Sequence, residues 1–197
     1  MSRLQAVVLA GGAGRRFGGG KLLAPYRGGE LIDGALKAAL SSPVKEVIVV
    51  TGYDGERVSE SIGAFARKHG DQPPLRTVHA ADYAQGMAAT LRAGVAALPA
   101  RSDGVFVFLG DMPSIPIGTA ARLAAALGDH AAAVPLFQGQ RGHPVLFARR
   151  LFPTLLALSG DQGARGVLDE LGEDLALVPE EGEGVLFDVD RWSDLAR

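Results

Sequence analysis

The sequence contains no cysteine and a single tryptophan. A chain without cysteine cannot form disulfides, bind iron–sulfur clusters through thiolates, use a thiol nucleophile or build most structural zinc sites. Any chemistry must therefore rest on carboxylates, lysine, arginine, histidine, hydroxyl groups or a hard metal ion.

Long apolar runs and blocks of charge are also missing. No apolar stretch approaches the roughly 20 residues of a membrane span, and the N-terminus lacks the charged, apolar and small-residue order of a cleaved signal peptide. We therefore expect a cytoplasmic protein with no membrane contact. The formal charge of −2 is spread along the chain and leaves no basic stripe for nucleic acid. A small-molecule partner is the better expectation.

The length of 197 residues and the hydrophobic content of 47% predict a single domain, residues 1–197. We expect it to be of the α/β class. Short apolar runs alternate with segments of helical spacing, which favours a mainly parallel sheet covered on both faces. Residues 138–166, broken by glycine and proline, are expected to add a hairpin or loop layer over one edge. The expected helices cover 31–40, 58–66, 85–98 and 119–127. The expected strands are Leu4–Ala10, Val44–Thr51, Leu75–Ala80, Val105–Leu109 and Ala131–Phe137.

The stretch from Val7 to Leu23, VVLAGGAGRRFGGGKLL, places glycines and cations directly after the first expected strand. A dinucleotide fingerprint, G-x-G-x-x-G, fails because Phe17 stands at its third glycine. A Walker A loop fails because an arginine and a leucine occupy its first glycine and its hydroxyl position. What remains is a loop whose exposed N–H groups can cradle a triphosphate, with Arg16 and Lys21 available for phosphate oxygens.

Two later segments supply carboxylates. Asp111 follows the expected strand Val105–Leu109, so it should lie beyond the carboxyl ends of the strands, where ligands bind in parallel sheets. The segment Val185–Asp190 is predicted to form a further strand with Asp188 and Asp190 on one face. Mg²⁺ commonly takes one or two carboxylates and completes its shell with water and phosphate, so Asp111 and one of this pair suffice.

The first loop resembles the signature of the molybdenum cofactor cytidylyltransferase and guanylyltransferase family of nucleotidyltransferases. The resemblance extends in the family's order from Val7 to Leu195 and implies a three-layer α/β/α, Rossmann-like fold of the nucleotide-diphospho-sugar transferase type with a mainly parallel, mixed sheet. The family commonly carries Thr-Pro-Glu-Asp after the aspartate that Asp190 matches, whereas here the next four residues read Arg-Trp-Ser-Asp. The matching loop pattern is Leu9-Ala10-Gly11-Gly12-x-Gly14-x-Arg16-x-Gly18-x-x-Lys21.

The resemblance also implies site residues. Arg16, Lys21 and Asp111 would be catalytic, and Asp111 and Asp190 would hold Mg²⁺, or Mn²⁺ in its place. The implied nucleotide-binding residues are Leu9, Ala10, Gly11, Gly12, Gly14, Arg16, Lys21, Gly86, Thr90 and Asp111. The implied acceptor-binding residues are Gly142, His143, Asp161 and Arg165.

The implied reaction joins a nucleoside monophosphate to the terminal phosphate of a molybdopterin-type cofactor. That phosphate attacks the α-phosphorus of a nucleoside triphosphate and expels pyrophosphate. No general base is needed, because the second pKa of a phosphomonoester, about 6, leaves it largely ionised at neutral pH. A client molybdoenzyme of the xanthine dehydrogenase type is the implied protein partner.

The base and the acceptor stay open on the sequence alone. Leu9–Gly12 resembles the guanylyltransferase branch, whereas Asp82–Met87, Gly142–Pro144 and Gly160–Arg165 resemble the cytidylyltransferase branch. The later segments outweigh the first, so CTP is favoured over GTP. The alternatives are a sugar- or polyol-phosphate nucleotidyltransferase of the same fold, a nucleotide-binding chaperone for molybdoenzymes, and a hydride-transferring Rossmann enzyme.

Overall fold

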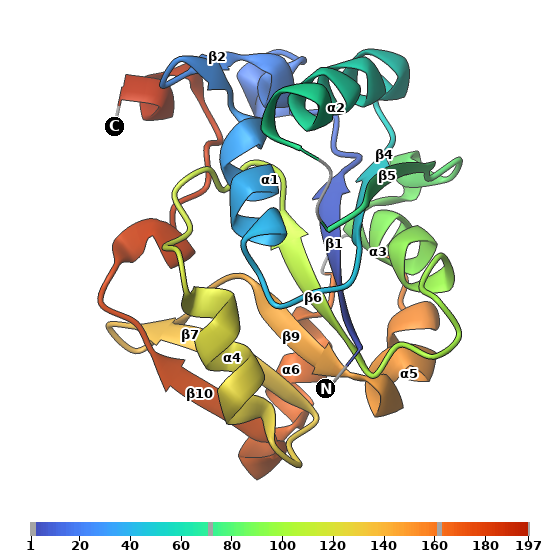
Figure 1. The fold of residues 1–197 in the computed structure, drawn as a ribbon, viewed down its shortest axis with the longest axis vertical. Coiled ribbons are helices and arrows are strands. Elements are labelled where there is room, and N and C mark those ends of the chain that lie inside the picture. Colours follow the sequence, from blue (N-terminus) through green and yellow to red (C-terminus); the bar gives the residue numbers. More distant parts are fainter. Residues whose placement is uncertain (1–2, 71–72, 161–162, 197) are drawn as a thin grey trace.

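The computed structural model describes residues 3–70, 73–160 and 163–196. A central eight-stranded sheet lies between two layers of helices (Figure 1). A separate small hairpin joins β2 (Pro25–Tyr26) to β3 (Gly29–Glu30). The strands of the main sheet are β1 (Leu4–Ala10), β4 (Val47–Thr51), β5 (Leu75–His79), β6 (Gly104–Leu109), β7 (Ala132–Phe137), β8 (Gln140–Arg141), β9 (Val145–Ala148) and β10 (Leu175–Pro179).

Parallel pairing dominates the sheet. The strands follow the order β10-β7-β9-β6-β1-β4-β5, and β8 pairs with β7 beside this path. Strand β1 pairs in parallel with both β4 and β6, β4 with β5, and β7 with β10. Strands β8 and β9 run antiparallel to their neighbours. The predicted α/β fold with a mainly parallel, mixed sheet is therefore confirmed.

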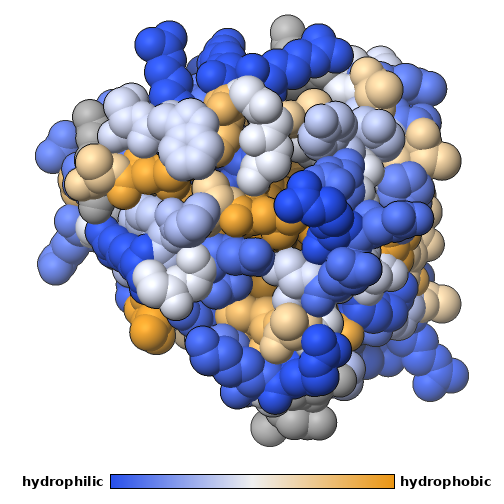
Figure 2. Space-filling view, turned by 90° about the horizontal axis from the view of Figure 1, so that it is seen from above, coloured by the Kyte–Doolittle hydropathy of each residue, from blue (hydrophilic) through white to orange (hydrophobic). Residues whose placement is uncertain are grey.

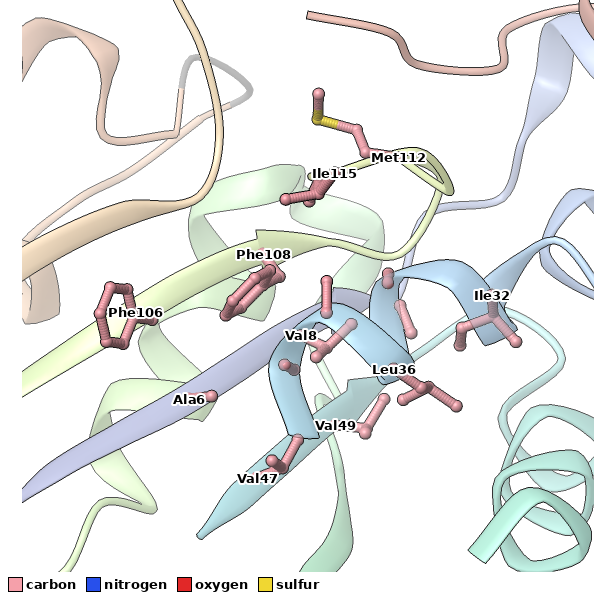
Figure 3. Close-up of a cluster of buried hydrophobic side chains, with 14 of the residues drawn as sticks. Ala6, Val8, Ile32, Leu36, Val47, Val49, Phe106, Phe108, Met112 and Ile115 are labelled. Carbon is pink, nitrogen blue, oxygen red and sulfur yellow. The ribbon is translucent and has the colours of Figure 1, made fainter. Parts of the chain in front are cut away.

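Helices cover both faces of the sheet because side chains alternate along each strand. Ala6 and Val8 of β1 point to the layer of α1, α2 and α4, while Val7 and Leu9 point to the layer of α3, α5 and α6. Figure 3 shows part of the first cluster, where Leu36 lies beside Val8. Among the described residues, no helix is long and apolar enough to span a bilayer. The helices are α1 (Ile32–Leu40), α2 (Gly55–His69), α3 (Met87–Ala96), α4 (Thr119–Leu127), α5 (Phe152–Leu156) and α6 (Arg165–Glu170).

The described part of residues 138–166 does not form the expected layer over an edge of the sheet. Strand β9 from this region enters the sheet itself, between β6 and β7, and the short β8 forms a hairpin with β7. Val145, Leu146 and Phe147 are all buried, as expected for a strand covered on both faces. Periodicity alone does not identify an apolar run this short as a strand, which is why the sequence does not reveal it.

The expected strand Val185–Asp190 is wrong. The chain forms a 3-10 turn at Glu183–Val185 and then continues to Asp190 without pairing to any strand of the described residues. Its backbone bonds instead to loops: the Val189 N–H donates to the Asp111 carbonyl at 3.1 Å, and the Val185 carbonyl accepts from the N–H of His143 at 2.9 Å. Val185 and Val189 are fully buried. Within Val185–Asp190 only Val185 and Val189 are buried, so the alternation of apolar and polar residues did not indicate strand pairing.

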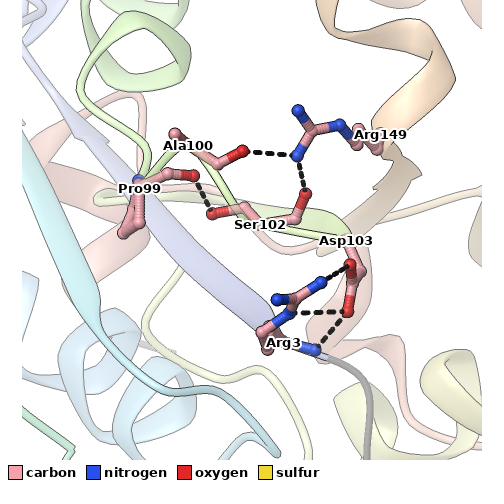
Figure 4. A network of polar contacts seen from close by, with 6 residues as sticks. All are labelled: Arg3, Pro99, Ala100, Ser102, Asp103 and Arg149. Carbon is pink, nitrogen blue, oxygen red and sulfur yellow. Dashed lines mark hydrogen bonds and ion pairs between the residues drawn. The ribbon is translucent and has the colours of Figure 1, made fainter.

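A polar network lies at the end of the sheet where β1 and β6 begin (Figure 4). The Arg3 guanidinium lies 2.9 Å from the Asp103 carboxylate and holds the pKa of Asp103 below its usual value. Arg149 donates to the carbonyl oxygens of Ala100 at 2.6 Å and Ser102 at 3.0 Å. Because Arg3 and Asp103 are exposed, their pair adds little to stability and serves mainly to hold the two strand starts side by side.

Candidate active site

A cleft of about 1000 Å³ lies at the opposite end of the sheet, where β1 and β6 end. Seen from above, this end of the molecule shows apolar surface in its middle, bordered by hydrophilic side chains (Figure 2). Ligands of open α/β sheets bind beyond the carboxyl ends of the strands, so the cleft stands in the expected place. The structure brings together there the expected nucleotide-binding and metal residues, namely Leu9, Ala10, Gly11, Gly12, Gly14, Arg16, Lys21, Gly86, Thr90, Asp111 and Asp190.

Glycines set the path of the loop after β1. Gly14 and the run 18–20 have φ angles between 57° and 94°, a region that residues with a side chain rarely enter. These glycines flank two 3-10 turns, Arg15–Phe17 and Lys21–Leu23. The chain therefore turns twice within a short distance, and cations from both turns line the cleft.

The floor of the cleft depends on contact between Gly11 and Thr90. A Cβ atom on Gly11 would lie 2.9 Å from Thr90 Oγ1, so a larger residue would push the loop away from α3. Gly12 differs, because within the described chain a Cβ atom there would meet no atom closer than 4 Å beyond its neighbours in sequence. The loop therefore leaves open space beside Gly12 at the edge of the cleft.

Ion pairs cross the cleft. Lys21 Nζ lies 2.6 Å from Asp111 Oδ2 and 3.8 Å from Asp190 Oδ1, and the Lys21 side chain is 12% exposed. Arg16 Nη1 lies 2.9 Å from Asp190 Oδ2, but the Arg16 side chain is 75% exposed. Water and salt screen exposed charges far more than buried ones, so the Lys21–Asp111 pair is the stronger of the two.

A third carboxylate, Asp188, also lines the cleft. Burial raises the pKa of Asp188 above its ordinary value, and the negative charges of Asp111 and Asp190 raise it further. In the described part of the chain, no three histidine or carboxylate side chains are close enough to hold a metal ion by themselves. A divalent ion in this cleft would therefore also need oxygens from phosphate or water, which is how proteins usually bind Mg²⁺ with nucleotides.

A second cavity, of about 570 Å³, adjoins the cleft and shares Leu9, Met87 and Leu109 with it. Its wall is partly apolar, from strand residues such as Val107, and partly polar. Asp161, expected to bind the acceptor, lies outside the described residues. The other expected acceptor residues all line this cavity, namely Gly142, His143 and Arg165.

His143 is the titratable group whose environment in this cavity is most altered. Burial lowers the pKa of His143, and the Val107 backbone and the charge of Asp111 oppose that shift without cancelling it. Its Nδ1 atom is buried and has no hydrogen-bond partner among the described residues. The imidazole is therefore neutral in the folded protein at neutral pH.

We expect His143 to make the protein sensitive to acid. Because its pKa in the folded state lies below the value of about 6.5 in an unfolded chain, the unfolded state binds the proton first as the pH falls. The free energy of unfolding should then decline below about pH 6.5, by up to about 1.4 kcal/mol per pH unit from this residue. Urea unfolding between about pH 7.5 and 5 should show a shallower decline for His143→Gln than for wild type. His130→Gln, at an exposed histidine, is the control, and equal slopes for His143→Gln and wild type would contradict the prediction.

Sequence reasoning missed Tyr53, which lines the cleft together with Tyr83. Tyr83 lies in the segment Asp82–Met87, which the resemblance already indicates. Tyr53 follows β4, and its N–H donates to the Gly11 carbonyl at 3.1 Å, which ties it to the first loop. The position of β4 as a parallel neighbour of β1 could have indicated Tyr53, since residues after adjacent parallel strands meet at one edge.

Several known proteins are similar to this chain. The family model of the MobA-like NTP transferase domain matches residues 6–175. The molybdenum cofactor cytidylyltransferase of Escherichia coli K12 is 30% identical over 149 residues, which cover 76% of this chain and 72% of that protein. Nicotine blue oxidoreductase of Paenarthrobacter nicotinovorans is 30% identical, with 97% of this chain and 94% of that protein aligned. The crystal structure of Rv0371c from Mycobacterium tuberculosis H37Rv covers 100% of this chain and 96% of its own, with a TM-score of 0.83 and 27% identity; Rv0371c has also been solved in complex with manganese.

Proposed function

Because the chain belongs to the family of MobA-like NTP transferases and is a nucleotidyltransferase, we propose that it transfers CMP from CTP to the terminal phosphate of a molybdenum–molybdopterin cofactor and releases pyrophosphate. The observation that carries the proposal is the junction of the two cavities at Leu9, Met87 and Leu109. Substrates held in the two cavities would present their reacting groups to each other there. The similarity to the E. coli cytidylyltransferase supports this choice of base and acceptor.

The carboxylates of the cleft fit a divalent metal. Asp111 and Asp190 offer hard oxygen ligands, which suit Mg²⁺ and Mn²⁺, and two carboxylates leave coordination positions for phosphate oxygens. We assign Mg²⁺ to these residues, with Mn²⁺ able to replace it, and the manganese complex of Rv0371c supports this assignment. The bound ion would neutralise charge on the phosphates of the nucleotide.

Catalysis of the transfer requires that the two substrates be positioned and that the negative charge of their phosphates be neutralised. An oxygen of the acceptor phosphate forms a bond to the α-phosphorus of CTP, and the bond from that phosphorus to the pyrophosphate oxygen breaks. The acceptor phosphate is already ionised, so no residue has to remove a proton. The N–H groups of the first loop and the Arg16 guanidinium would bind the triphosphate, while Lys21 would neutralise charge where the two substrates meet.

We expect CTP to be preferred over GTP by about tenfold to a hundredfold in kcat/KM, or about 1.4 to 2.8 kcal/mol. The preference should be incomplete because the open space beside Gly12 does not exclude a purine. Gly12→Ala should widen it, since the added methyl group fills that space without straining the backbone. Competition of CTP and GTP at equal concentration with molybdopterin as acceptor, with products identified by mass, measures the ratio. Predominant guanosine dinucleotide would show that another base is used.

Pyrophosphate release tests the transferase against the other candidates. We expect pyrophosphate to form in proportion to the cytidine dinucleotide and only when the molybdopterin acceptor is present. A chaperone would bind nucleotide without releasing pyrophosphate, and a sugar- or polyol-phosphate transferase would need a different acceptor. The similarity to nicotine blue oxidoreductase makes an oxidoreductase the second candidate. Oxidation of NADH or NADPH without any pyrophosphate release would favour it.

A further inference from the structure

The only tryptophan of the chain contacts the glycine-rich loop from a segment far away in sequence. Trp192 stacks on Phe17, with ring centroids 4.4 Å apart and planes inclined by 24°. Its indole N–H also donates to the Phe17 carbonyl at 3.0 Å, across a separation of 175 residues. Phe17 ends the turn Arg15–Phe17, which carries Arg16. Trp192 therefore touches the part of the loop that presents a triphosphate-binding cation.

The segment of Trp192 also carries Asp190. The Asp194 carboxylate accepts hydrogen bonds from the N–H of Asp190 at 3.0 Å and of Arg191 at 2.8 Å, which fixes the backbone between Asp190 and Trp192. On the other side of Asp190, Val189 is fully buried in one apolar cluster with Phe17. The Asp190 carboxylate is thus held between two contacts with the same turn of the loop.

We propose that Trp192 is a positioning residue, which aligns Asp190 with the glycine-rich loop for binding of the metal and triphosphate. The proposal rests on the function proposed above. A loop with several glycines in the left-handed region loses much conformational freedom when it binds a ligand, and this loss weakens binding. The stack and the hydrogen bond from Trp192 order the loop in advance. Trp192 is 61% exposed, so it is not needed to fill the core.

Nucleotide binding without acceptor tests the proposal most directly. CTP and GTP, each with Mg²⁺, are titrated calorimetrically into wild type and variants, and steady-state rates are measured in parallel. We expect Trp192→Ala to weaken nucleotide binding by about tenfold. It should raise KM and the Mg²⁺ concentration at half-maximal rate by about the same factor, while kcat changes by less than about threefold. Trp192→Phe, which keeps a stacking ring, should recover most of the loss. Arg191→Ala removes the exposed neighbouring side chain and should bind like wild type.

A merely structural role would give a different result. It would lower the melting temperature and the active fraction and leave KM unchanged, and that outcome, or equal nucleotide affinity in Trp192→Ala and wild type, would overturn the proposal. If Trp192→Ala does not fold, Phe17→Leu tests the same stack from the other side and should raise KM as well. If wild type binds neither nucleotide, the proposed function fails together with this inference. If wild type binds nucleotide and Trp192→Ala binds it equally well, only this inference fails. Emission of the lone tryptophan should also change when Mg²⁺ and nucleotide bind wild type.

Discussion

Exchange of Asp111 for asparagine is expected to lower kcat for nucleotidyl transfer by about a thousandfold at ordinary Mg²⁺ concentrations, with a melting temperature close to that of wild type. The amide has the same shape as the carboxylate, so packing at the end of β6 is kept. The metal, however, would lose a charged ligand, and Lys21 would lose the negative charge that lies 2.6 Å away. Initial rates over a Mg²⁺ titration, together with thermal melting followed by circular dichroism, measure both quantities.

Asp129→Asn is the matched control for this experiment. Asp129 is exposed and is not among the residues that line the cleft, so its exchange should leave both the rate and the melting temperature unchanged. Near-normal transfer by Asp111→Asn at ordinary Mg²⁺ would show that the ion is held elsewhere.

Removal of the Lys21 ammonium should lower kcat by about a hundredfold to a thousandfold and change the KM for nucleotide only slightly. Lys21 is nearly buried between the two carboxylates, where its charge would act strongly on substrates bound in the cleft. Arg16→Ala should mainly raise KM, because an exposed guanidinium at the rim would bind the triphosphate similarly in the ground state and in the transition state.

Initial rates at saturating acceptor, with the nucleotide varied, separate these two effects. Lys37→Ala, which removes an exposed lysine of α1 outside the cleft, controls for the loss of one positive charge. If Lys21→Ala raised KM and left kcat intact, the division of roles between Lys21 and Arg16 would be wrong.

The sequence alone predicts the part of the site that comes directly after two buried strands. Apolar runs end at Ala10 and Leu109, and the structure ends β1 and β6 at these residues. Because the two strands are parallel neighbours, Gly11 and Asp111 meet at one edge of the sheet. Local periodicity and the rule for parallel sheets therefore place the glycine-rich loop beside Asp111 without further information.

The remaining features depend on contacts between distant segments. The position of β9 inside the sheet depends on pairing with both β6 and β7, which a short apolar run cannot specify. The segment around Val189 has the alternation of apolar and polar residues that is typical of a strand, but the N–H of Val189 donates to the carbonyl of a loop residue and not to a strand. The stack of Trp192 on Phe17 has no local signal, because neither residue belongs to a motif that predicts the other.

The ion pairs that cross the cleft also determine how its ligands depend on each other. In this structure Lys21 is paired with Asp111, and Arg16 with Asp190. A cation that occupies the carboxylates would release the lysine and the arginine, and a triphosphate that occupies those two would release the carboxylates. Metal and nucleotide should therefore bind with positive linkage, and by thermodynamic reciprocity each raises the affinity of the protein for the other by the same factor. We therefore expect the free protein to bind the nucleotide as its metal complex more tightly than it binds either ligand alone.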